Sequence, residues 1–84
     1  MDRLYNAVIA LEAARSTLTT YGEDGAAAAL RGLEVYSIES AEVALDAVRH
    51  APVRTLEGRM ALVDAAYALE FAASRHSTKM RAVA

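Results

Sequence analysis

The sequence contains no cysteine, no tryptophan, one proline and four glycines in 84 residues. Without cysteine the chain can form no disulfide, and no thiol is available as a catalytic nucleophile. Because proline and glycine are scarce, long segments carry no helix breaker, and most of their residues have good helix propensity. We therefore expect an all-α protein.

Large apolar side chains are also scarce for a chain that is 55% hydrophobic, since 20 of its residues are alanine and 26 are larger. Burying a Val, Leu, Ile, Phe or Met side chain contributes roughly 1.5–3 kcal/mol, and an alanine much less. A monomer with so thin a core would be marginally stable, and small domains often gain stability by oligomerisation. We therefore expect a homo-oligomer.

No apolar run is long enough to cross a bilayer, because charged residues interrupt each run within about ten residues and about 20 are needed. The opening Met1-Asp2-Arg3 is not followed by a compact apolar run with a small-residue cleavage site. These features predict a cytoplasmic protein with no membrane partner.

Breaks near residues 21–25 and 50–52 divide the chain into three helical segments, about 3–20, 25–49 and 52–79. Asp24 is the expected N-cap of the second helix, and Pro52 suits the first turn of the third. We expect one domain, residues 1–84, folded as a compact antiparallel three-helix bundle that dimerises.

The apolar patterns of the second and third segments differ. In 25–49 the apolar stripe continues across Gly32 and Ser37, which favours one long helix. In 52–79 a second stripe lies beside the first and makes the apolar arc unusually broad. The first stripe is Leu56, Met60, Val63, Tyr67 and Phe71, and the second is Leu62, Ala66, Leu69 and Ala73. This surplus of apolar surface predicts a protein interface.

Two charged residues, Arg15 and Glu70, are centred on otherwise apolar stripes. Either they pair across a helix interface, or Arg15 extends to solvent from near the end of its helix, or one of them faces a partner protein. Tyr5, Ile9 and Val35 lie off the main stripes and are expected to be exposed. We assign these five residues to a protein interface.

Catalytic and metal-binding patterns are weak. Glu39, Glu42, Asp46 and His50 share one helical face, but no matching ligand cluster occurs on another helix, which favours a solvated acidic face. The sequence has no phosphate-binding glycine loop and no nucleophile-elbow motif. We expect no enzymatic activity, no cofactor and no metal.

Nucleic-acid binding is a further alternative. Ala28, Gly32 and Ile38 match the residue types of a helix-turn-helix, but acidic residues at 39 and 42 would oppose phosphate. A basic cluster near the C-terminus could make weak, salt-sensitive phosphate contacts. Its members are Arg75, His76, Lys79 and Arg81.

No motif identifies a family. The pattern is typical of a small, non-enzymatic helical protein that acts through protein–protein interaction, as a self-associating regulator or adaptor. Two alternatives stay open. One is an inhibitor, encoded by a phage or another mobile element, that docks on a host complex. The other is a weak nucleic-acid-binding regulator.

Overall fold

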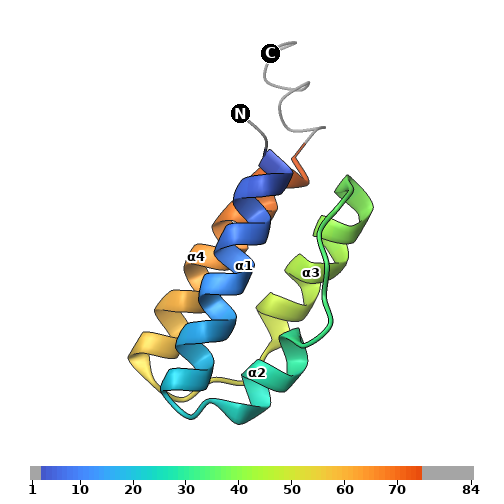
Figure 1. Ribbon diagram of the computed structural model, residues 1–84. Coiled ribbons are helices and arrows are strands. Elements are labelled where there is room, and N and C mark those ends of the chain that lie inside the picture. Colours follow the sequence, from blue (N-terminus) through green and yellow to red (C-terminus); the bar gives the residue numbers. More distant parts are fainter. Residues whose placement is uncertain (1–2, 75–84) are drawn as a thin grey trace.

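The computed structural model describes residues 3–74, which form four helices and no strand. They are α1 (Arg3–Thr20), α2 (Asp24–Leu30), α3 (Ile38–His50) and α4 (Leu56–Ala72). Helices α1 and α4 lie side by side and antiparallel, and α3 lies beside this pair (Figure 1). The all-α expectation is confirmed. The expectation of three helices is wrong, because residues 25–49 do not form one helix.

Helix α1 has the predicted bounds, and a glycine ends it. Gly22 adopts a left-handed φ of 71°, its N–H donates to the Thr19 carbonyl at 3.2 Å, and the Glu23 N–H donates to the Leu18 carbonyl at 2.8 Å. This pair of bonds is the Schellman arrangement, which satisfies carbonyls that the helix end leaves without partners.

The break between α2 and α3 has two local causes. Gly32 adopts a φ of 80°, which removes the chain from the helical region after Leu30. Ser37 then caps a new helix, because its hydroxyl accepts from the Ser40 N–H at 3.1 Å and the Ser40 hydroxyl accepts from the Ser37 N–H at 2.9 Å. The chain is therefore non-helical from 31 to 37.

Helix α4 begins later than predicted. Pro52 lies in the loop before it, and Thr55 is the N-cap, with its hydroxyl accepting from the Gly58 N–H at 3.0 Å. Asp24 is the first residue of α2, and Glu23 holds the N-cap position that we expected Asp24 to fill. The α-helix ends at Ala72, so the predicted extension to 79 is not confirmed within the described residues.

The core lies between α1, α3 and α4, with α2 closing one end (Figure 1). The most extensive helix contact is between α1 and α4, where buried alanines such as Ala7, Ala14 and Ala65 allow the backbones to approach closely. The largest fully buried side chains are Leu11, Leu18, Leu30 and Leu69. No helix of the described part is long and apolar enough to cross a membrane.

Candidate functional site

The main surface feature is a row of large apolar side chains on α4, which we call the outer stripe. Its side chains are 52–78% exposed. Its members are Leu56, Met60, Val63, Tyr67 and Phe71. At about 100° per residue these positions lie about 180° from the buried residues Leu62, Ala65 and Leu69, so the outer stripe faces directly away from the core. The broad apolar arc predicted from the sequence thus consists of two opposite faces of α4. Only one of these faces packs against the other helices of this chain.

Charged residues border the outer stripe on both sides. Glu57 and Asp64 lie toward one edge, and Arg59 and Glu70 share the other at nearly the same helical angle. All four are exposed. The outer stripe is therefore an apolar band with one acidic edge and one edge of mixed charge.

On α1, Tyr5 and Ile9 are exposed as expected, at 61% and 48%. Arg3 places its guanidinium carbon 4.6 Å from the centre of the Phe71 ring, a cation–π contact that links the start of α1 to the end of α4. This contact orients the ring at one end of the outer stripe.

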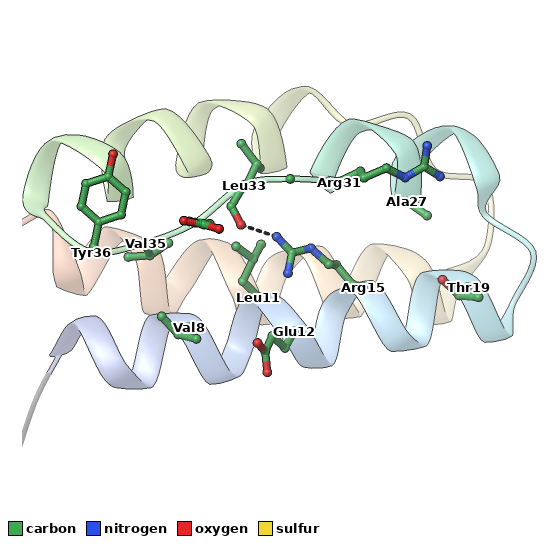
Figure 2. A pocket seen from close by; sticks show the side chains of 12 residues that line it. Val8, Leu11, Glu12, Arg15, Thr19, Ala27, Arg31, Leu33, Val35 and Tyr36 are labelled. Carbon is green, nitrogen blue, oxygen red and sulfur yellow. Dashed lines mark hydrogen bonds between the residues drawn. The ribbon is translucent and has the colours of Figure 1, made fainter.

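Arg15 contacts backbone and not a carboxylate. Its Nε donates to the Leu30 carbonyl at 3.0 Å, and its Nη2 donates to the Leu33 carbonyl (Figure 2). The Leu30 carbonyl belongs to the last residue of α2, where a cation is also favoured by the helix dipole. Arg15 therefore holds the end of α2 and the segment after it against α1.

Glu70 pairs with Arg49 of α3, and both side chains are about half exposed, at 51% and 54%. A pairing of Arg15 with Glu70, one of the alternatives that the sequence left open, does not occur within this chain. Arg15 lies on the side of α1 that faces α2, whereas Glu70 lies on the side of α4 that faces α3. The two charges therefore belong to separate contacts.

Val35 is only 7% exposed, so the expectation that it is an exposed interface residue is wrong. It belongs to the non-helical segment 31–37, and the break between α2 and α3 turns its side chain into the core. An open groove of about 620 Å³ lies between this segment and α1 (Figure 2). Arg15 closes part of the groove by its bonds to the segment.

Glu23 is the residue that the sequence analysis missed. It is 4% exposed, and its Oε2 accepts from the N–H groups of Arg54 and Thr55 at 2.9 and 2.6 Å and from the Thr55 hydroxyl at 2.6 Å. The bonds from Thr55 and Arg54 hold the pKa of this carboxyl below its usual value. Glu23 thus joins the α1–α2 turn to the start of α4, a structural role.

The acidic face of α3 forms no ligand cluster. His50 Nδ1 lies 2.8 Å from the Asp46 carbonyl oxygen and 3.4 Å from its carboxylate, and both side chains are exposed. Residues 3–74 contain no group of three or more side chains placed to hold a metal ion. The basic positions Arg75, His76, Lys79 and Arg81 lie outside the described residues.

No protein-family model matches the chain, and no curated protein or solved structure matches it either.

Proposed function

We propose that the protein acts by binding protein, without catalysis, as a small helical regulator or adaptor, and that the outer stripe of α4 is its binding surface. The observation that supports this proposal is the exposure of five large apolar side chains along one face of a single helix. A surface helix of a lone domain normally presents polar residues on the side away from its core.

The size of the outer stripe supports the same proposal. A fully buried aromatic side chain covers about 150–250 Å², so Tyr67 and Phe71, exposed at 78% and 52%, together present roughly 200–300 Å². Leu56, Met60 and Val63 add to that area. Monomeric proteins seldom expose contiguous apolar patches above a few hundred Å² unless the patch binds something.

A photo-crosslinking amino acid at Tyr67 tests this proposal. Tyr36 is the matched control, because it is 74% exposed against 78% for Tyr67 but lies on the segment 31–37. We expect crosslinked protein from position 67 and little from position 36 in cells that express the protein naturally, and also in the purified protein where the partner is a second copy. The product mass identifies the partner as a second copy or as another protein.

A second pair of variants separates binding from folding. Val63 and Val43 are 60% and 62% exposed, on the outer stripe and on α3. We expect Val63→Ser to remove the crosslink from position 67 and Val43→Ser to leave it, with both variants folded, since exposed substitutions usually change stability by within about 0.5 kcal/mol. If no crosslink forms at position 67, or if both variants lose it equally, the proposal is wrong.

A further inference from the structure

We infer that the partner of the outer stripe is a second copy of this chain, with the two α4 helices packed antiparallel and Arg59 of each copy against Glu70 of the other. This inference depends on the proposed function, because it names the occupant of the same surface.

The charges on one edge of the outer stripe favour this arrangement. Arg59 and Glu70 are eleven residues, or about three turns, apart, so they lie on the same edge about 16 Å from one another along the axis. A two-fold axis perpendicular to α4 near residue 64 brings each arginine opposite the glutamate of the second copy. Glu70 already pairs with Arg49, so each carboxylate would lie between two guanidinium groups. In parallel packing the edge with Arg59 and Glu70 would instead lie against the acidic edge of the second copy. Arg59 would then face Glu57, and Glu70 would gain no cationic partner across the interface.

The shapes of the side chains agree with the charges. The first half of the outer stripe is aliphatic, with Leu56 and Met60, and the second half is aromatic, with Tyr67 and Phe71. Antiparallel packing about the same axis places Leu56 opposite Phe71 and Met60 opposite Tyr67, so that long flexible side chains fill the spaces beside rings. Val63 then lies close to Val63 of the second copy. The opposed helix dipoles also favour this orientation.

The area available predicts a weak dimer. The outer stripe extends about 22 Å from residue 56 to residue 71 at 1.5 Å per residue, which is a single helix–helix contact. Such a contact falls at the low end of interface sizes, below about 1,200 Å² in total. We therefore expect a dissociation constant in the micromolar range.

The acidic edge opposes association. About the same axis Asp64 lies close to Asp64 of the second copy, and like charges facing each other are unfavourable. We expect Asp64→Asn to tighten the dimer about two- to threefold and Glu57→Gln, farther from the axis, to change it less.

Single cysteines test the orientation, since the natural chain has none. A disulfide forms only where two Cα atoms approach within about 7 Å. We expect Val63→Cys to give a linked dimer by itself under mild oxidation. Leu56→Cys and Phe71→Cys should each stay unlinked alone, and a mixture of the two should give the mixed dimer. If Leu56→Cys links to itself, the helices are parallel and the inference is wrong.

Charge reversal tests the edge. Arg59→Glu and Glu70→Arg should each weaken the dimer about tenfold, because each change replaces two symmetric attractions by repulsions, and the double variant should recover to within about threefold of the natural chain. Arg49→Ala is the control, since it removes only the partner of Glu70 within the chain, and it should change affinity less than twofold.

Sedimentation equilibrium distinguishes the two proposals. A monomer mass at several hundred micromolar overturns the inference that a second copy occupies the outer stripe. If the crosslinker at Tyr67 still captures another protein under those conditions, and Val63→Ser removes it, the proposed function stands. If neither assay shows association, both proposals fail.

Discussion

At the scale of single residues, Glu23 has the most consequential contacts of the described chain. Its carboxylate accepts three hydrogen bonds from Arg54 and Thr55, which lie 31 and 32 residues further along the sequence. Hydrogen bonds to an ionised acceptor are stronger than neutral ones. The ionised form of Glu23 therefore stabilises the junction between the α1–α2 turn and α4.

This contact predicts a pH dependence. The pKa of Glu23 is lowered in the folded chain from an ordinary value of 4.5, so its contribution to stability is fully present above about pH 4.5 and is lost as pH falls through the folded pKa. We expect Glu23→Gln to melt at a lower temperature than the natural chain at pH 7, with the difference shrinking as pH falls toward 3. Thermal melts from pH 7 to pH 3 measure it.

Glu42→Gln is the control for this experiment, because Glu42 is exposed on α3. It should change the melting temperature little at pH 7. A Glu23→Gln variant that melts at the natural temperature at pH 7 would contradict the assigned role.

Arg15 and Glu70 should respond differently to truncation. Arg15→Ala leaves two partly buried carbonyls without a charged donor, and we expect a loss of about 1–2 kcal/mol in the free energy of unfolding. Glu70→Ala breaks a half-exposed ion pair and should cost less than about 0.5 kcal/mol in a monomer. Denaturant titration at low protein concentration measures both values.

The double variant completes this test. Because the two residues share no contact, their effects should add within about 0.5 kcal/mol. A large non-additive term would show that the two charges are coupled, as a direct ion pair would be.

The sequence identified Arg15 and Glu70 as unusual but could not identify their partners. A charge within an apolar stripe requires compensation, and periodicity alone does not say whether a carboxylate or a backbone carbonyl supplies it. The partner of Arg15 is the end of α2, which exists only because the helix stops at Leu30. The exposure of Tyr5 and Ile9 was predicted correctly, since it follows from the face of α1 alone.

At the scale of elements, periodicity predicted α1 from Arg3 to Thr20, because its apolar spacing is regular and Gly22 ends it. It did not predict the gap between α2 and α3, where Leu30 and Leu33 keep helical spacing through the break. The signals present there were Gly32 and the pair Ser37 and Ser40, which forms a capping box with serine in place of the usual glutamate. Local capping therefore outweighed the apolar pattern.

The start of α4 predicts opposite effects for two glycine substitutions. A Cβ at Gly58 would lie 2.6 Å from Val53 Cγ2 and 3.0 Å from Glu23 Oε2. Such crowding typically costs about 1–3 kcal/mol, more than the 0.5–1 kcal/mol that alanine gains over glycine in a helix. We therefore expect Gly58→Ala to lower the free energy of unfolding by about 1–2 kcal/mol.

Gly25→Ala is the matched variant in α2, where the nearest atom to the added Cβ is Pro52 Cγ at 3.4 Å, an ordinary contact. It should raise the free energy of unfolding by about 0.5–1 kcal/mol. Urea titration of both variants measures these changes. If Gly58→Ala is also stabilising, the close packing of Val53 and Glu23 against α4 is not present in solution.

At the scale of the whole molecule, the chain has a thin core and a large uncovered apolar face. The core consists of leucines, valines and many alanines, whereas Met60, Tyr67 and Phe71 of α4 lie outside it. Sequence periodicity could show that α4 has two apolar faces. It could not show which face packs against α1 and α3, because that choice depends on the small residues Ala65 and Ala72, which allow close approach.

If the uncovered face is used for self-association, thermal stability must depend on protein concentration. Anything that binds only the folded chain stabilises it by mass action, and a hundredfold rise in concentration contributes about 2.7 kcal/mol per dimer, or about 1.4 kcal/mol per chain. For a chain of this size 1 kcal/mol shifts the melting temperature by about 4–8 °C. We therefore expect the melting temperature to rise by about 5–10 °C between 5 and 500 μM, measured by calorimetry.

Two tyrosine variants are the controls for this experiment. Tyr67→Ser should melt at one temperature throughout this range. Tyr36→Ser, similarly exposed but away from α4, should keep the concentration dependence of the natural chain. A natural chain whose melting temperature stays constant over the same range would show that the outer stripe does not bind a second copy, and the stability of the monomer would then come entirely from its alanine-rich core.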